Sequence, residues 1–217
     1  MPAAPEAPVL PRLAVSVIML RRDADDPVVF IQNRAHTMDF AAGMVVFPGG
    51  RVDGKDYVTA RKPELSRVAE RHASAWQKSA ISDGGARSTR EMSAILLAAA
   101  LREVEEETGA SLTAGELTPW ANWVTPSGMP KRFDTYFYLT QPAPSLDPRH
   151  QTTEASSSHW SSVRSILTEA DDGALQLMPP TRHLLEELVG LDPDDKQFRS
   201  GRPIEPVWAM LPGRPVL

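Results

Sequence analysis

The sequence predicts an α/β domain in which a mixed β-sheet is sandwiched between helices. Runs dense in β-branched and apolar residues at 13–20 and 28–34 flank a turn at 23–27 and indicate a β-hairpin. A long helix is predicted over 89–108, and further strands and then two helices follow it. Strands that alternate with helices in this order favour an α/β sandwich with mixed strand directions.

Composition limits the class of protein. The chain has 217 residues, of which 41% are hydrophobic and 24% are charged, as in ordinary globular proteins. The net charge of −5 argues against a nucleic-acid binder with a broad basic surface. The chain contains no cysteine, which excludes disulfides and thiolate sites. No run approaches the roughly 18–20 apolar residues of a membrane span, and the N-terminus does not resemble a secretory signal. We expect a cytoplasmic protein without a membrane or nucleic-acid polymer as partner.

The first half of the chain predicts a short strand and a helical segment after the hairpin. Residues 1–11 are expected to be a loose arm, and residues 44–50 a strand that ends in a Pro-Gly-Gly turn. Residues 54–90 are more polar, with a helical stretch at 64–80 and a break at 82–85. This segment is too short for its own core, so we interpret it as an insertion.

The long helix has signals at both ends. Ser88 and Glu91 have the spacing of a capping box, which predicts a start near Thr89. Gly109 stands where a left-handed C-terminal cap would end the helix after Thr108.

The second half predicts strands at 122–126, 133–140 and 159–160, and helices at 162–170 and 179–190. Trp120 and Trp123 are an odd number of residues apart and should face opposite sides of a strand. The domain is therefore expected to cover 12–190. We expect the tail, 191–217, to be irregular and to pack on the domain or on a dimer partner.

Four glutamates crowd the C-terminal end of the long helix. At about 100° per residue, Glu103, Glu106 and Glu107 lie within about 60° of one another, whereas Glu105 points away. Leu97 and Val104 belong to a different face, which we assign to the core. Three converging carboxylates suit a hard divalent cation such as Mg²⁺, although an acidic run alone is more often a solvated surface.

The acidic helix together with the glycines upstream resembles the Nudix box, G-x5-E-x7-R-E-U-x-E-E-x-G-U, in which U is a bulky aliphatic residue. The matching positions are Gly50, Arg102, Glu103, Val104, Glu106, Glu107 and Gly109. The resemblance implies a Nudix fold with a helical insertion.

The box is interrupted. Arg102 stands 38 positions later than an uninterrupted box would place it after Gly50. Counting forward from Gly50 puts the first box glutamate at Asp56, whereas counting back from Arg102 puts it at Ala94, so this carboxylate is either shortened or missing.

Boxes interrupted in this way occur in the branch related to peroxisomal coenzyme A diphosphatases. Three further stretches, at 33–56, 123–139 and 175–188, are similar to that branch. Asn122 and Tyr136 stand where relatives often carry arginine, which predicts an altered substrate preference.

The resemblance implies hydrolysis of a diphosphate linkage in a nucleoside diphosphate joined to another group. Mg²⁺ or Mn²⁺ would be held by Glu103, Glu106, Glu107 and the carbonyl of Gly50. Arg102 would pair with a box glutamate and fix its orientation.

The remaining site residues are assigned by role. The general base is either one of the box glutamates, by preference Glu106, or Glu154. Arg34, Asp56 and Arg132 are candidates for substrate binding. The histidines show no paired metal spacing, so no zinc site is expected.

Two further hypotheses stay open. A Nudix-fold protein could bind such a ligand, or regulate in response to it, without cutting it. The 54–90 segment could form a lid or a contact in a homodimer.

Overall fold

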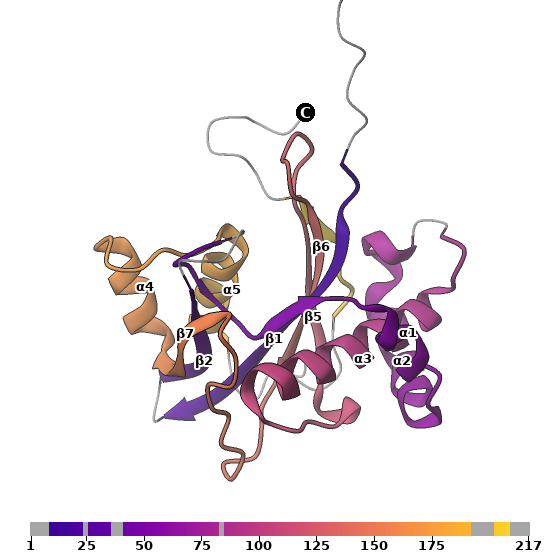
Figure 1. Cartoon of the computed structure of the whole chain (residues 1–217), viewed down its shortest axis with the longest axis horizontal. Coiled ribbons are helices and arrows are strands. Elements are labelled where there is room, and N and C mark those ends of the chain that lie inside the picture. The colour runs from indigo at the N-terminus through magenta and orange to yellow at the C-terminus, as the bar shows by residue number, and fades with distance from the viewer. Residues whose placement is uncertain (1–8, 24–25, 36–40, 83–84, 192–201, 209–217) are drawn as a thin grey trace, which may run out of the picture.

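A mixed β-sheet runs through the molecule and carries helices on both faces (Figure 1). The structure is a computed structural model that describes residues 9–23, 26–35, 41–82, 85–191 and 202–208. Within these residues the strands are β1 (Arg12–Asp23), β2 (Asp26–Arg34), β3 (Val45–Val46), β4 (Gly49–Arg51), β5 (Thr118–Val124), β6 (Phe133–Thr140), β7 (Ala155–Ser162) and β8 (Pro206–Trp208).

The sheet is built around β1. The strand order is β3-β2-β1-β6-β5-β8, with β4 also paired to β1 and β7 to β2. The first part of β1 pairs in parallel with β6, and its last part pairs antiparallel with β2 as the predicted hairpin. The β5–β8 pair is also parallel, whereas β2–β7 and β5–β6 are antiparallel. The predicted mixed sheet is therefore confirmed.

Five α-helices and three short 3₁₀ turns are formed by the described residues. The helices are α1 (Gly54–Thr59), α2 (Pro63–Ala75), α3 (Thr89–Thr108), α4 (Val163–Asp171) and α5 (Pro179–Val189), and the turns are η1 (Trp76–Lys78), η2 (Ala80–Ser82) and η3 (Ala114–Glu116). In this part of the chain, no helix combines the length and the apolar character that crossing a bilayer would require.

Helix α3 has the bounds that its capping signals predict. The side chain of Ser88 accepts a hydrogen bond from the Glu91 N–H, and the Glu91 carboxylate accepts one from the Ser88 N–H at 2.8 Å. Gly109 ends the helix with φ at 67°, a left-handed conformation that glycine adopts without a Cβ clash. The capping box and the glycine cap are both confirmed.

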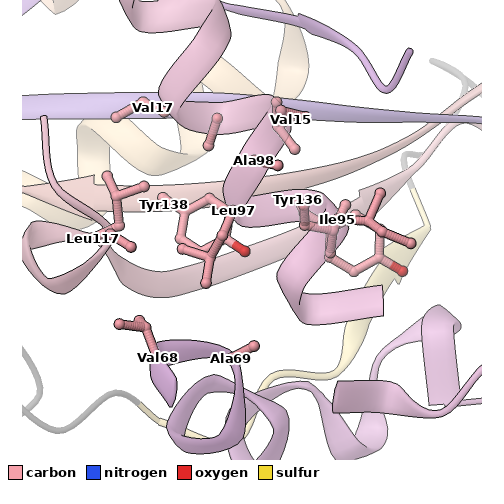
Figure 2. Packing of buried hydrophobic residues seen from close by; sticks show 14 of the residues in the cluster. Val15, Val17, Val68, Ala69, Ile95, Leu97, Ala98, Leu117, Tyr136 and Tyr138 are labelled. Carbon is pink, nitrogen blue, oxygen red and sulfur yellow. The ribbon is translucent and has the colours of Figure 1, made fainter. Parts of the chain in front are cut away.

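Each face of the sheet buries its own hydrophobic core. Val15 and Val17 of β1 point to the face covered by α2 and α3, whereas Ile18 and Leu20 point to the face covered by α4 and α5. Figure 2 shows the first of these cores, where Tyr138 of β6 lies close to α3. The helices on both faces give the sandwich that the sequence predicts.

The 54–90 segment contributes to the first core. Leu65, Val68 and Trp76 are less than one-tenth exposed and belong to the same cluster as the buried face of α3. Figure 2 places Val68 and Ala69 opposite that helix. The segment thus contributes to the domain core, and the lid or dimer contact suggested for it stays a prediction. Of the predicted break at 82–85, residues 83–84 lie outside the described residues.

Residues 44–50 do not form the single strand that we predicted. β3 pairs with β2, whereas β4 pairs with β1. Pro48 stands between them and has no N–H to donate to a ladder, although its carbonyl accepts a hydrogen bond from the Val17 N–H at 2.8 Å. The chain therefore passes from one neighbour strand to another at this proline.

The tryptophans of β5 do not face opposite sides. The pairing of β5 with β6 shifts register between Pro119 and Ala121, so a bulge falls at Trp120. Such a bulge adds one residue to a strand and breaks the alternation of side chains. Trp120 and Trp123 are 0% and 8% exposed and share the core below α5. β5 also begins four residues earlier than predicted, and β7 is longer than residues 159–160.

The C-terminal region is more regular than expected. Residues 206–208 form β8, which extends the sheet beside β5. The side chain of Ile204 is 3% exposed, and its N–H donates to the Ala75 carbonyl at 2.9 Å. These long-range contacts hold the segment on the domain. The rest of the predicted tail, 192–201 and 209–217, and residues 1–8 of the predicted arm lie outside the described residues.

A buried histidine lies between α2 and the sheet. His72 is 7% exposed, and its ring centroid is 5.9 Å from that of Tyr138. Its Nδ1 has no hydrogen-bond partner among the described residues. Burial, with a smaller contribution from the positive charge of Arg71, lowers the pKa of His72 to about 4. The imidazole is therefore neutral in the folded protein at pH 7.

Replacing this histidine should reduce the sensitivity of the fold to acid. Because the pKa of His72 is about 4 when folded and 6.5 ordinarily, the unfolded chain binds the proton first as the pH falls. The wild type then loses stability between pH 6.5 and pH 4, with a loss of about 2 kcal/mol by pH 5. His72→Phe should lack this loss in urea unfolding at pH 7.5 and pH 5.

The exposed His150 supplies the control for this comparison. His150→Gln should keep the acid sensitivity of the wild type. Equal losses of stability in His72→Phe and the wild type would contradict the assignment of a buried neutral imidazole.

Candidate active site at the acidic end of helix α3

The three glutamates of the predicted face differ in their exposure. The side chain of Glu106 is 46% exposed and that of Glu103 is 13% exposed, whereas Glu107 is 6% exposed as a residue. Glu105 is exposed and lies near Ser111, as expected for a solvated residue. The acidic face therefore runs from the interior of the domain to its surface.

Two glycines bring the backbone of β4 against these carboxylates. The N–H of Gly49 donates to Oε2 of Glu107 at 2.9 Å. A Cβ on Gly50 would lie 2.4 Å from Oε1 of Glu103, closer than any side chain can approach. On the other side, a Cβ on Gly49 would lie 2.2 Å from the Val15 carbonyl oxygen. Only glycine fits at position 49, where the clash is with backbone, whereas a side chain at position 50 would have to displace the carboxylate of Glu103.

Arg102 is at the centre of an ionic cluster. Its guanidinium lies 2.7 Å from Oε1 of Glu103 and 3.1 Å from Oε2 of Glu106, and it donates to the Arg51 carbonyl at 2.9 Å. The carboxylate of Asp56 binds its other face, and these hydrogen bonds raise the pKa of Arg102 above its ordinary value. Arg102 therefore has the contacts of a positioning residue that orients the glutamates.

Asp56 is not placed to bind substrate, contrary to our assignment. Its two carboxylate oxygens accept hydrogen bonds from Nε and Nη2 of Arg102, each at 2.8 Å. Oδ2 also accepts from the Asp53 N–H at 2.7 Å as part of the capping box of α1. The residue is 1% exposed. Of the two positions considered for the first box carboxylate, Asp56 contacts Arg102, whereas Ala94 is buried in the core.

Burial makes Glu107 a weak acid. Desolvation is the main cause that raises its pKa to about 7, and the negative charges of Glu103 and Glu154 add to the effect. The Gly49 N–H and the positive charge of Arg34 oppose it. Burial also raises the pKa of Glu103, against the stabilising hydrogen bond from Arg102. Burial therefore disfavours the ionised form of both carboxylates.

Glu106 has a different environment because Lys55 reaches it from α1. The Nζ of Lys55 lies 2.6 Å from Oε1 of Glu106, and this hydrogen bond lowers the pKa of Glu106. Lys55 thus binds the carboxylate of Glu106, and Arg102 binds those of Glu103 and Glu106. Across the described ranges, no three Asp, Glu or His side chains converge on a point suited to a metal ion.

Arg34 and Glu154 lie at the rim of the same site. The Ala35 N–H donates to the Glu154 carbonyl at 2.9 Å, next to the pairing of Arg34 with Ala155. Both side chains are close enough to Glu107 for their charges to change its pKa. Two residues predicted from separate parts of the chain are therefore brought to the acidic helix.

The loop before β7 is fastened to the end of α3. The Arg149 N–H donates to the Thr108 carbonyl at 2.8 Å, and the Gln151 N–H donates to the Glu107 carbonyl at 3.2 Å. The side chain of Gln151 also packs against Gly109. These contacts bring the loop that leads to Glu154 to the C-terminal end of α3.

Arg132 has other contacts than the predicted one with substrate. Its Nε donates to the Thr125 carbonyl at 3.0 Å and its Nη1 donates to the Val9 carbonyl at 2.8 Å. These bonds join the two ends of the loop between β5 and β6 to the residues just before β1. Arg132 is thus engaged in a structural role, and the prediction that it binds substrate is not supported.

Asn122 and Tyr136, which stand where relatives often carry arginine, are also buried inside the domain. Asn122 and Tyr136 are fully buried, and both donate to Asp134, from Nδ2 at 2.6 Å and from the phenol at 2.9 Å. They satisfy a buried carboxylate whose pKa is raised by its burial. This argues against our expectation that these positions alter substrate preference directly.

Sequence reasoning missed Lys55 and Gly49. The signal for Gly49 was present in the Gly-Gly pair, of which only Gly50 was assigned. No local pattern distinguishes Lys55 from an ordinary exposed lysine, because its contact with Glu106 spans 51 positions.

A NUDIX domain model matches residues 68–188, which is more than half of the chain. The chain therefore belongs to the Nudix family. The matched region includes all of α3 with its glutamates, whereas Gly49, Gly50 and Asp56 precede it.

Individual relatives agree with this assignment. The chain is 27% identical over 191 residues to the Caenorhabditis elegans protein "Putative nudix hydrolase 7", covering 82% of this chain and 61% of that protein. It thus spans about three-fifths of the length of that curated relative.

Solved structures share the fold. The NUDIX hydrolase from Alicyclobacillus acidocaldarius superposes with a TM-score of 0.66 at 23% identity, over 89% of this chain and 98% of that one. The MutT NUDIX hydrolase from Burkholderia pseudomallei gives 0.50 at 19%, over 82% and 98%. The NUDIX domain of Shewanella oneidensis NrtR, solved with ADP ribose, gives 0.50 at 15%, over 86% and 91%.

Removing the buried partner of Arg102 should destabilise the domain. Asp56→Ala removes the carboxylate that accepts two hydrogen bonds from Arg102, whose side chain is only 15% exposed. We expect a loss of about 3–5 kcal/mol in the free energy of unfolding, measured by urea denaturation with circular dichroism.

The exposed ion pair between Lys78 and Glu205 is the matched control. Its atoms are 3.0 Å apart, but both side chains are more than 60% exposed. Glu205→Ala should therefore cost less than about 1 kcal/mol. Similar losses in the two variants would show that the Asp56–Arg102 pair is not structural.

Proposed function

We propose that this protein hydrolyses the diphosphate linkage of a nucleoside diphosphate joined to another group. The observation that supports this most is the acidic face of α3, on which Glu107 and Glu103 lie against the Gly49–Gly50 turn, in a chain of the Nudix family. The family generally acts on nucleoside diphosphate derivatives with a divalent metal. Small molecules of this class are the proposed substrates.

The residues present suit a divalent cation. Carboxylate and main-chain oxygens are the donors that Mg²⁺ and Mn²⁺ prefer. The missing Cβ at Gly50 lets the main chain reach the carboxylate of Glu103. Glu107 has a pKa of about 7 because it is buried near other carboxylates, so an added positive charge would favour its ionised form.

Glu103, Glu106 and Glu107, with the carbonyl of Gly50, would hold the cation in this proposal. A bound Mg²⁺ or Mn²⁺ would supply neutralisation of phosphate oxygens and a lower pKa for a coordinated water. Glu106 would exchange its contact with Lys55 for this role. The released ammonium of Lys55 would then lie near a bound phosphate and add to its attraction.

The proton of the attacking water goes to a carboxylate oxygen, for which Glu106 and Glu154 are the candidates. Water oxygen bonds to phosphorus, the bridging P–O bond breaks, and the bridging oxygen leaves on the other phosphate. Glu154 is exposed beside Glu107 and is free of a metal role in this proposal. Glu106 is also a proposed metal ligand, and its contact with Lys55 lowers its pKa.

Arg34 is the proposed phosphate ligand of the chain itself. It lies at the end of β2, close enough to Glu107 to lower the pKa of that carboxyl. A guanidinium can donate two parallel hydrogen bonds to a phosphate. The similarity of stretches in the sequence to coenzyme A diphosphatases favours a coenzyme A-like compound among the substrates. A cytoplasmic location and a homodimer also stay predictions.

The alternative is a Nudix-fold protein that binds such a ligand without turnover. The NrtR domain that shares this fold was solved with ADP ribose. Against this alternative, the glutamates of the acidic face are all present and lie against the glycine turn. We therefore favour the enzyme.

Product analysis by chromatography should separate the two readings. The purified protein with Mg²⁺ or Mn²⁺ would be incubated with coenzyme A, NADH, ADP-ribose and UDP-glucose. We expect metal-dependent cleavage at the diphosphate, with kcat/KM at least about 100-fold lower in Glu103→Gln and Glu106→Gln, since removing one electrostatic contact in a reacting site typically has this effect.

Glu105→Gln is the matched control, because this exposed glutamate lies on the same turn of α3 and points away. It should retain wild-type activity. Glu154→Gln should lower kcat while leaving metal affinity unchanged if this residue is the base. Ligand binding without cleavage by the wild type would favour the regulatory alternative.

A methyl group at Gly50 should also impair the site. The Cβ of Gly50→Ala would displace the carboxylate of Glu103, and we expect kcat/KM and Mn²⁺ affinity to fall at least about tenfold. Mn²⁺ binding would be measured by calorimetry. Gly54→Ala, whose Cβ would meet nothing within 4 Å, should change neither, and an equally active Gly50→Ala would argue against a site at this turn.

A further inference from the structure

The 54–90 segment is basic in an acidic protein. It contains eight lysines or arginines and four aspartates or glutamates, so it carries +4 in a chain of net charge −5. The rest of the chain therefore carries −9. One of the four acids, Asp56, is buried against Arg102 and does not offset the surface charge.

Four arginines of this segment line one open groove of about 700 Å³ along α2 and the start of α3. This volume lies in the range of small-molecule sites, about 300–1,000 Å³. The groove, which we call the arginine groove, is formed by Arg61, Pro63, Ser66, Arg67, Glu70, Arg71 and Arg90. All four guanidinium side chains belong to exposed residues.

The arginine groove has little internal compensation of charge. Glu70 is its one acidic residue, and its Oε2 lies 2.8 Å from Nε of Arg90. Within the described part of the chain, none of the ion pairs involves Arg61, Arg67 or Arg71. Arg67 and Arg71 are also spaced i, i+4 on α2, where like charges repel. The spacing of Arg67 and Arg71 therefore does not stabilise α2.

We propose that the arginine groove binds a small ligand that carries two or more phosphate groups. Guanidinium groups donate paired hydrogen bonds to phosphate oxygens, and several of them together match several phosphates. The N-terminus of α2 has no side-chain cap, and it opens beside the groove at Pro63. The positive end of the helix dipole lies there too, partly offset by Glu64 in the first turn of α2.

The arginine groove is a different place from the acidic site. Arg90 stands sixteen residues before Glu106 on α3, which is about 24 Å along the helix axis. In Figure 1, α2 lies at the side of the molecule opposite α4 and α5. A ligand in the groove could therefore be bound while a substrate occupies the acidic site.

Several features favour a small phosphorylated ligand over a nucleic-acid strand. The residues that line the groove include no aromatic side chain on which a base could stack. The negative charge of the rest of the chain would repel a long polyanion that leaves the groove. A compact ligand avoids this repulsion.

Calorimetric titration with inorganic tripolyphosphate tests this proposal directly. The full chain would be titrated in EDTA, so that no divalent cation supports binding at the acidic site. We expect saturable binding to the wild type that weakens at least about tenfold in Arg67→Gln/Arg71→Gln, since half of the guanidinium groups are removed. Binding should also weaken with added salt.

Lys78→Gln/Arg87→Gln is the matched control, because it removes two charges from the same segment outside the groove. It should bind as the wild type does. Glu106→Gln should also bind normally, so the result does not depend on the proposed hydrolysis.

The proposal fails if the wild type does not bind tripolyphosphate, or if the two double variants weaken equally. It is also overturned if a single-stranded oligonucleotide binds the groove more tightly than tripolyphosphate. Circular dichroism of each variant confirms that any loss of binding is not a loss of fold.

Discussion

The pairing of Arg102 with Asp56 connects the parts of the molecule on which the acidic site depends. Two parallel hydrogen bonds of 2.8 Å join α3 to α1, although 46 positions separate the two residues. The same guanidinium contacts Glu103, Glu106 and the carbonyl of Arg51, so one side chain aligns the acidic face with β4, the strand that contains the glycine pair. Because Asp56 is almost fully buried, water cannot replace it as a partner, and the geometry of the site follows from this contact.

Local signals in the sequence predicted most of the elements. Ser88, Glu91 and Gly109 act through neighbours three or four residues away, and α3 has the bounds they indicate. The errors concern pairing between distant segments. Nothing near Pro48 shows that the chain changes its neighbour strand there, and the bulge at Trp120 depends on its register with β6. β8 exists only because β5 offers a free edge to a segment more than 80 residues later, which composition cannot reveal.

The acidic site likewise has features that local sequence predicted and features that depend on distant segments. The spacing of Glu103, Glu106 and Glu107 on one helix predicted a shared face, whereas their unequal burial depends on distant segments such as β4, which binds the carboxylate of Glu107. Residue type alone misled us about Asp56 and Arg132, since a charged residue near a motif can bind protein groups instead of substrate. Asp56 nevertheless stands at the position where counting forward from Gly50 places the first box carboxylate. Its role could be assigned only when its distance from Arg102 was known.

The contacts of Lys55 and Arg102 mean that the acidic face carries its own counterions. Glu106 is held between an ammonium at 2.6 Å and a guanidinium at 3.1 Å, on residues that belong to the same chain. Loading a divalent ion would accordingly be an exchange of one cation for another, and unloading it would leave the carboxylates compensated. A domain organised in this way would keep its shape when a metal ion is gained or lost, because Lys55 and Arg102 limit the repulsion among the glutamates.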